Sequence, residues 1–203
     1  EGYVVVNYSK IQEFFSKVDL SLDRDYEKES SEFVKANIVE MEGLKKLRPS
    51  VEAGFHSILQ KYVIHTHPVY ANILCCAVNG RELMEKIFRD ADFATAWVSY
   101  INPGFCLTLK IKEAIEKSLE ETGQFPQVIF MENHGLIATA NDSEECINLH
   151  QKANDMIRDY YDLKEQYPQL HLEKIDDSNF VSRTEYLIEY FRNNPISPNF
   201  FDE

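Results

Sequence analysis

The chain has 203 residues, of which 44% are hydrophobic, and it carries 21 Lys and Arg residues against 34 Asp and Glu residues, a formal net charge of −13. This length and hydrophobic content are typical of one globular domain with a substantial core, so we predict a single domain over residues 1–203. The acidic balance disfavours a nucleic-acid partner, because phosphate backbones repel negative charge and no Lys/Arg cluster interrupts the sequence.

The cysteines and the apolar runs bear on the cellular compartment. The four cysteines form no Cys-x-x-Cys pair, and Cys75 and Cys76 are adjacent within an apolar run. This pattern is typical of reduced, mostly buried thiols in a cytoplasmic protein rather than of a disulfide framework. No apolar run approaches the ~20 residues needed to cross a bilayer, and we find no signal peptide, so we expect no membrane partner.

Hydrophobic periodicity predicts helices and short strands that alternate along the chain. In chain order, the first predicted elements are a strand at Tyr3–Tyr8, helical patches at Ile11–Val18 and Ser31–Leu44, a helix at Val51–Tyr62 and a strand at Val63–His67. They are followed by helices at Pro68–Ala77, Arg81–Phe88 and Leu107–Leu119, strands at Val128–Met131 and Leu136–Thr139, a helix opened by Asp142 and reaching Tyr161, and a helix at Phe180–Phe191. This alternation predicts an α/β layered domain.

Two histidines lie at the end of the predicted strand Val63–His67. Alternate side chains of an extended strand point to the same face, so His65 and His67 are expected to project together and can share one metal ion. A third histidine, His134, follows the apolar run Val128–Met131 in a similar setting. Three histidines at strand ends can make a tetrahedral zinc site with one position open for substrate. The alternative is that they are polar residues at strand ends with no shared ligand.

The candidate acid or base is Glu52, at the start of the helix that leads into the histidine strand. A carboxylate beside a metal-bound substrate can remove a proton from carbon. The alternative is a glutamate favoured at a helix start by the macrodipole. Tyr100 is a candidate proton donor, and Glu132 is a candidate hydrogen-bond partner for a metal-bound histidine. We expect His56 to be a core histidine and His150 to be structural or exposed.

Taken together, four blocks of the sequence resemble the class II aldolase/adducin family in order and approximate spacing. The blocks are Arg48–His56, His65–Pro68, Tyr100–Gly104 and Glu132–Gly135, and the resemblance covers roughly Tyr3–Tyr161. The combination is specific, although each block alone is not. The resemblance implies a three-layer α/β/α sandwich with a central, largely antiparallel sheet. It also implies a homo-oligomer, commonly a tetramer with active sites at subunit interfaces.

The family's enzymes of known activity are zinc-dependent aldolases acting on fuculose 1-phosphate or rhamnulose 1-phosphate, ribulose-5-phosphate 4-epimerase and a methylthioribulose-phosphate dehydratase. The resemblance therefore implies a sugar-phosphate substrate and a bound Zn²⁺ or another divalent metal. The metal ligands that it implies are His65, His67 and His134. Glu52 matches the catalytic glutamate, and Tyr100 looks like the tyrosine that reaches into a neighbouring subunit's site as a proton donor. Ser50 matches a serine that helps to hold the substrate phosphate.

The sequence departs from the family pattern in two places. A second serine before the glutamate is replaced here by Val51. The family's Gly-Asn and Ser/Thr-Gly phosphate loops should precede the strand that Tyr3–Asn7 resembles, yet the chain begins at Glu1 without a methionine. We therefore expect an N-terminally shortened version of a longer protein, lacking its phosphate-loop segment. The charge-rich stretch of residues 19–46 is also longer than the corresponding family segment and has no assigned role.

The resemblance favours a metal-dependent aldolase that cleaves a ketose 1-phosphate to dihydroxyacetone phosphate and an aldehyde through a zinc-stabilised enediolate. Two alternatives use the same site, namely a pentulose-phosphate 4-epimerase and a sugar-phosphate dehydratase. A third alternative is a non-catalytic, adducin-like binding module. Retention of three histidines and Glu52 favours an enzyme, because a scaffold has no need of them.

Overall fold

A computed structural model of the chain describes residues 3–43, 45, 47–163 and 170–195. The chain divides into two compact units, Glu1–Leu163 and Lys164–Glu203. All the predicted site residues lie in the first unit. That residues 1–203 form one domain stays a prediction.

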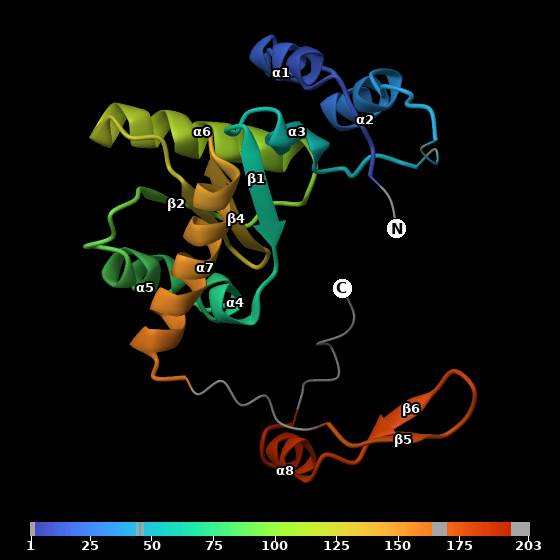
Figure 1. Cartoon of the computed structure of the whole chain (residues 1–203), viewed down its shortest axis with the longest axis vertical. Coiled ribbons are helices and arrows are strands. Elements are labelled where there is room, and N and C mark those ends of the chain that lie inside the picture. Colours follow the sequence, from blue (N-terminus) through green and yellow to red (C-terminus); the bar gives the residue numbers. More distant parts are fainter. Residues whose placement is uncertain (1–2, 44, 46, 164–169, 196–203) are drawn as a thin grey trace. The chain divides into compact units, whose positions relative to one another are not determined.

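The first unit is built around a four-stranded sheet (Figure 1). Its strands are β1 (Tyr62–Thr66), β2 (Thr95–Val98), β3 (Val128–Met131) and β4 (Gly135–Ala140). Its helices are α1 (Tyr8–Ser16), α2 (Tyr26–Ala36), α3 (Ala53–His56), α4 (Val69–Cys75), α5 (Gly80–Ile87), α6 (Phe105–Thr122) and α7 (Ser143–Tyr160). The strand order is β1-β4-β3-β2. Strands β1 and β3 pair antiparallel with β4, whereas β2 pairs parallel with β3, so the predicted largely antiparallel sheet is a mixed one.

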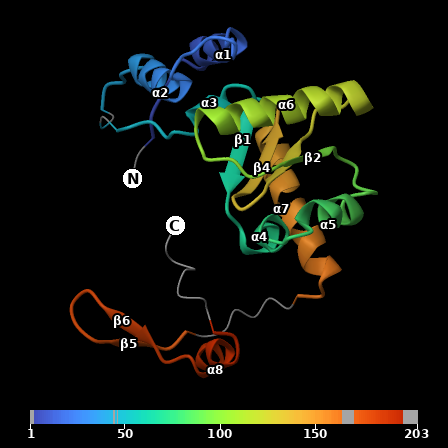
Figure 2. The ribbon, with the colours of Figure 1, turned by 180° about the vertical axis from the view of Figure 1, so that it is seen from behind.

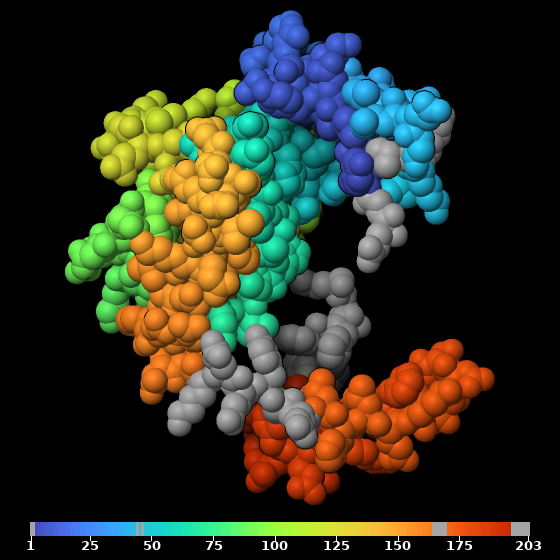
Figure 3. Space-filling view, viewed as in Figure 1, coloured from blue at the N-terminus to red at the C-terminus, as the bar shows by residue number. Residues whose placement is uncertain are grey.

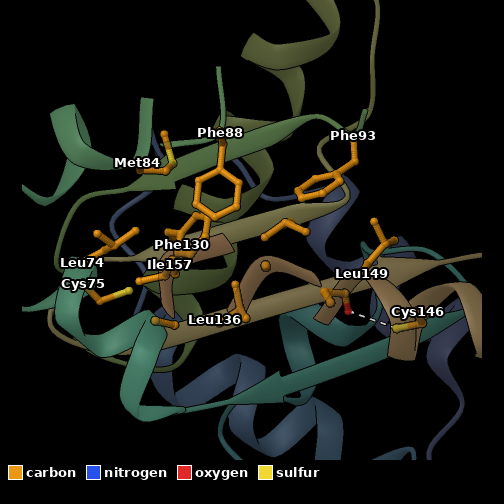
Figure 4. Packing of buried hydrophobic residues seen from close by; sticks show 14 of the residues in the cluster. Leu74, Cys75, Met84, Phe88, Phe93, Phe130, Leu136, Cys146, Leu149 and Ile157 are labelled. Atoms are coloured by element: carbon orange, nitrogen blue, oxygen red, sulfur yellow. Dashed lines mark hydrogen bonds between the residues drawn. The ribbon is translucent and has the colours of Figure 1, made fainter. Parts of the chain in front are cut away.

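Helices cover both faces of this sheet because its central strands are apolar on both sides. In β3, Val128 and Phe130 belong to a core cluster formed with α4, α5 and α7, while Ile129 and Met131 belong to another formed with α3 and α6. The period of two in an extended strand produces this division. Figure 4 shows the first cluster, in which Phe88 packs on Phe130. In this respect the unit agrees with the predicted α/β/α layering.

Helices α1 and α2 pack beside α3, and α2 also contacts α6. Figure 2 shows the two helices next to α3, and Figure 3 shows them at the surface of the first unit. The contact is aromatic: the Phe105 ring stacks on Tyr26 and Phe15, with centroids 5.2 and 5.7 Å apart. Both carboxylate oxygens of Glu27 accept from the Phe105 backbone N–H, at 3.1 and 3.2 Å. Part of the charge-rich stretch of residues 19–46 therefore docks on the start of α6.

Several predicted elements differ from those observed. The predicted strand Tyr3–Tyr8 is wrong, because Val6 makes only an isolated bridge and the Asn7 side chain caps α1 from Tyr8 onward. The predicted helical patch Ser31–Leu44 is α2 instead, ending at Ala36, and residue 44 lies outside the described residues. Of the predicted helix Val51–Tyr62, only the four residues of α3 are helical.

The second unit holds a short hairpin and one helix. Strand β5 (Leu172–Lys174) pairs antiparallel with β6 (Phe180–Ser182), and α8 (Glu185–Asn193) follows. The predicted helix Phe180–Phe191 is therefore a strand followed by a helix. No residue of α8 is buried.

Two further expectations concern membrane-spanning helices and the burial of the cysteines. Among the described helices, none is both long enough and apolar enough to cross a membrane. All four cysteines are free; Cys75 and Cys146 are buried, but Cys76 and Cys106 are exposed. The expectation of mostly buried thiols therefore holds for only half of them.

Candidate metal centre

Strand β1 presents the first two histidines. His65 lies within the strand, opposite Ile137 of β4, and His67 follows the strand's last residue. Pro68 then caps α4 with an extended backbone, at φ −75° and ψ 147°, which ends the strand. As the period-two rule predicts, the two rings project together, and their Nε2 atoms lie 3.2 Å apart.

The tight turn between β3 and β4 delivers His134. Asn133 adopts a left-handed backbone conformation, with φ 51°, which asparagine tolerates better than most residues. Its N–H donates to the Cys75 carbonyl at 2.8 Å, and the His134 N–H donates to Met131 at 3.1 Å. The Cys75 thiol in turn donates to the Gly135 carbonyl at 3.4 Å. The C-terminal end of α4 therefore holds the turn that carries the third histidine.

The three histidines form one cluster, which we call the histidine cluster (His65, His67 and His134). One nitrogen from each ring lies within 4.8 Å of the others. Tetrahedral zinc with Zn–N bonds of about 2.0–2.1 Å requires ligand nitrogens about 3.4 Å apart, a separation that small ring rotations reach. His67 is exposed while the other two are partly buried, so the cluster opens to solvent on one side.

The protonation of the rings also suits a metal. His65 Nδ1 lies 3.0 Å from the Leu136 carbonyl, which can only accept, so Nδ1 carries a hydrogen and the neutral ring offers Nε2 to a metal. Burial, and then the neighbouring His65, lower the pKa of His134. A lowered pKa favours the neutral imidazole, which is the form that binds metal.

Glu52 faces the histidine cluster. Its Oε1 lies 3.1 Å from His134 Nε2 and 3.6 Å from His65 Nε2. Glu52 precedes α3, and its backbone N–H donates to Ser50 Oγ at 3.2 Å. The carboxylate is directed at the candidate ligands and makes no capping bond to its own helix, which favours a chemical role over a helix-start preference.

Gly135 leaves the space that the cluster needs. A Cβ at this position would lie 2.5 Å from the Thr66 backbone oxygen and 2.6 Å from His67 Cδ2. Because the backbone oxygen belongs to the end of β1, a methyl group must displace both the strand and the His67 ring. We expect Gly135→Ala to lower the free energy of unfolding by about 1–3 kcal/mol and to weaken zinc binding at least about tenfold. Urea denaturation and competition with a zinc-binding dye measure the two effects.

Gly123→Ala is the matched control. Gly123 has φ +70° and no atom within 4 Å of an added Cβ. Its replacement is expected to cost about 1–2 kcal/mol of backbone strain and to leave zinc affinity unchanged. Zinc binding by the Gly135→Ala protein as tight as that of the unmodified chain would contradict this role for Gly135.

Glu132 contacts Tyr100 and not a candidate metal ligand, which differs from the role that the sequence suggested for Glu132. Glu132 Oε2 accepts from the Tyr100 backbone N–H at 3.0 Å, so it supports the tyrosine loop rather than a histidine ring. The Tyr100 hydroxyl donates to Asn102 Oδ1 at 3.3 Å, and the residue is 56% exposed. Within this chain, the phenol is therefore engaged at its own turn.

Of the three remaining histidines, His150 and His56 belong to the first unit. His150 Nε2 lies 2.7 Å from Thr66 Oγ1 and supports β1 from α7, which fits the expected structural role. His56 is exposed and stacks on Phe55 with ring centroids 4.7 Å apart, so the expectation of a core histidine is wrong. Sequence reasoning missed the Leu136 carbonyl and Gly135. For Gly135 a signal existed, since a glycine directly after a candidate ligand often marks a close backbone approach.

Comparison with known proteins identifies the family of the chain. Residues 21–161 match the Class II Aldolase and Adducin N-terminal domain. The chain is 35% identical over 120 residues to the uncharacterized oxidoreductase YuxG of Bacillus subtilis (strain 168), a match that covers 57% of this chain and 16% of YuxG.

One solved structure supports the fold. The N-terminal class II aldolase domain of a conserved protein from Thermoplasma acidophilum is similar, with a TM-score of 0.58, 21% identity, and coverage of 78% of this chain and 66% of that one. YgbL from Klebsiella pneumoniae, a putative aldolase/epimerase/decarboxylase, gives a TM-score of 0.41 at 17% identity, over 61% and 62% of the two chains. The chain thus spans less than two thirds of these relatives, and it belongs to the class II aldolase and adducin N-terminal domain family.

Proposed function

We propose that the protein is a metal-dependent aldolase that cleaves a ketose 1-phosphate to dihydroxyacetone phosphate and an aldehyde. The observation that carries the proposal is the meeting of three imidazoles with the Glu52 carboxylate, whose Oε1 lies 3.1 Å from His134 Nε2. His65, His67 and His134 would hold the metal, Zn²⁺ or another divalent ion. When bound, the ion supplies a Lewis acid for the negative charge of the enediolate that cleavage leaves behind.

The residues of the chain then have separate roles. During cleavage the C4 hydroxyl gives up its proton as the C3–C4 bond breaks, and a proton is returned to C3. Glu52 would carry the proton at carbon, since its carboxylate lies 3.1 Å from His134 Nε2 and 3.6 Å from His65 Nε2. Ser50, two residues away, would help to hold the substrate phosphate.

Tyr100 belongs to the same proposal as a residue that serves a neighbouring subunit. Its phenol is 56% exposed, and to serve a second copy of the chain its hydroxyl would leave Asn102 Oδ1. There it would exchange the proton of the aldehyde oxygen. A homo-oligomer, with a tetramer favoured, and a cytoplasmic location complete the proposal.

Product analysis tests the reaction. We expect zinc-loaded protein, incubated with fuculose 1-phosphate or rhamnulose 1-phosphate, to release dihydroxyacetone phosphate and an aldehyde, observed by ¹H and ³¹P NMR. An inverted sugar phosphate without fragments indicates the epimerase alternative, and loss of water indicates the dehydratase. Zinc-loaded protein that converts none of these substrates contradicts the enzyme proposal and favours an adducin-like binding module. The name of YuxG does not decide among these, because the match covers 16% of that protein.

A further inference from the structure

The end of strand β1 carries two of the three candidate metal ligands. Because β1 lies at an edge of the sheet, β4 is its partner among the described strands, and their pairing ends with Thr66 opposite Leu136. His67 follows this last pair, and Pro68 after it has no backbone N–H to donate. The position of His67 therefore depends on what else holds the end of the strand.

Thr66 lies between the two ligands in the sequence but faces the opposite side of the sheet. Val63 packs against the core cluster formed with α3 and α6, whereas Ile64 packs against the cluster formed with α7. Since alternate side chains of a strand share a face, Thr66 lies with Ile64 on the α7 side. There its Oγ1 lies 2.7 Å from His150 Nε2, and both residues are partly buried.

Helix α7 contacts β1 at both ends of the strand. At the first residue of the strand, the Cys146 thiol donates to the Tyr62 carbonyl at 3.5 Å. At the last residue, His150 bonds to the Thr66 hydroxyl. Cys146 and His150 are four residues apart, so they lie on the same face of α7. Of these two contacts, the one at Thr66 is adjacent in sequence to both ligands from β1.

We propose that Thr66 and His150 are positioning residues, which hold the end of β1 so that His65 and His67 are already directed at one metal ion before it binds. Neither of the two residues touches the ion. The inference rests on the proposed function for the presence of the metal centre.

The physical reason is preorganisation of the ligands. A metal site whose ligands are already held in place loses less conformational freedom when the ion binds, so its affinity is higher. Residues that orient metal ligands from outside the coordination sphere typically change metal affinity by about 10–100-fold. The bond between Thr66 and His150 should therefore matter to metal affinity although it lies on the other face of the strand.

The test compares two changes of Thr66 with a change at the other end of the same strand. Thr66→Val replaces the hydroxyl by a methyl group of similar size, and Thr66→Ser keeps a hydroxyl. The control is Cys146→Ala, which removes the contact of α7 with Tyr62 and a buried side chain, but leaves Thr66 bonded. Zinc affinity is measured by competition with a chelating dye. The visible absorption spectrum of bound Co²⁺ reports the ligand geometry, and urea denaturation reports stability.

We expect Thr66→Val to weaken zinc binding about tenfold and to change the Co²⁺ spectrum, while Thr66→Ser restores most of the affinity and the original spectrum. Cys146→Ala should lower the urea midpoint yet keep zinc affinity within about twofold. The reason is that a modest loss of stability leaves nearly all of the protein folded, with its ligands in place.

A double variant tests whether the two residues act as a pair. His150→Phe keeps an aromatic ring but removes the nitrogen that meets Thr66. Combined with Thr66→Val, it should weaken zinc binding little more than the stronger of the two single changes, because both remove the same bond. Losses that multiply in the double variant would contradict the pairing.

The outcomes separate this inference from the proposed function. Equal zinc affinity and equal Co²⁺ spectra for Thr66→Val and the unmodified chain overturn the inference and leave the metal centre in place. An equal loss of zinc affinity in Thr66→Val and Cys146→Ala also overturns it, since that result indicates general support of the strand. Zinc binding that depends on Thr66, in a protein that cleaves no ketose 1-phosphate, supports the inference and contradicts the aldolase.

Discussion

Replacing His134 with alanine is expected to lower zinc affinity more than about 100-fold and kcat/KM for aldol cleavage by about a thousandfold or more. His134 is the ligand held by the β3–β4 turn, and its Nε2 lies 3.1 Å from the Glu52 carboxylate. Its loss leaves two ligands, both from β1 and its end, which cannot close a tetrahedral site. Zinc content is measured by competition with a chelating dye, and activity by coupled reduction of dihydroxyacetone phosphate.

The control is His171→Ala, which changes an exposed histidine of the second unit. It is expected to bind zinc and cleave substrate like the unmodified chain. Circular dichroism of the His134→Ala protein should show a folded chain, since His134 lies in a turn outside the core clusters. Unchanged zinc binding in this variant would remove His134 from the ligand set, and with it the proposed metal centre.

Glu52→Gln tests the proton carrier. Glutamine keeps the size of the side chain but cannot take up or release a proton, so we expect kcat to fall about 10²–10⁴-fold at saturating zinc. Because the backbone N–H of residue 52 still donates to Ser50, the segment leading into α3 should keep its conformation. Steady-state kinetics at several zinc concentrations measure kcat separately from metal occupancy.

Two further variants serve as controls for Glu52→Gln. Glu82→Gln, an exposed carboxylate on α5, is expected to leave kcat unchanged. Glu52→Asp retains a carboxylate on a shorter side chain and should recover part of the lost rate. A Glu52→Gln enzyme with full kcat would assign the proton transfer to another group, and the role of Glu52 would reduce to positioning.

Features that depend on a few adjacent residues could be predicted from the sequence. The apolar run of β3 coincides with its predicted bounds, and Asp142 caps α7 as its side chain predicts. These features are local, because strand period and capping depend on a few adjacent residues. The common projection of His65 and His67 follows from the same period.

What could not be predicted depends on contacts between distant segments. The parallel pairing of β2 with β3 is set by the path of the chain through α6, not by the composition of residues 95–98. Only four residues of the predicted helix after Pro49 are helical. There Gly54 lies against α6, so close that a Cβ added at Gly54 would lie 2.5 Å from Thr108 Oγ1. The role of Glu132 depends on where the Tyr100 loop passes, which spacing along the sequence does not reveal.

The strand order β1-β4-β3-β2 places β1 at an edge of the sheet, while the β3–β4 turn joins the two central strands. Since two candidate ligands come from β1 and its end and the third comes from that turn, a bound ion would fasten an edge strand to the centre. Edge strands are the part of a sheet that separates most readily. Metal at about 100 times its dissociation constant would stabilise the folded chain by about 2.7 kcal/mol. A bound metal would therefore stabilise the pairing of β1 with β4. In protein without metal, β1 would be the first strand to separate from the sheet.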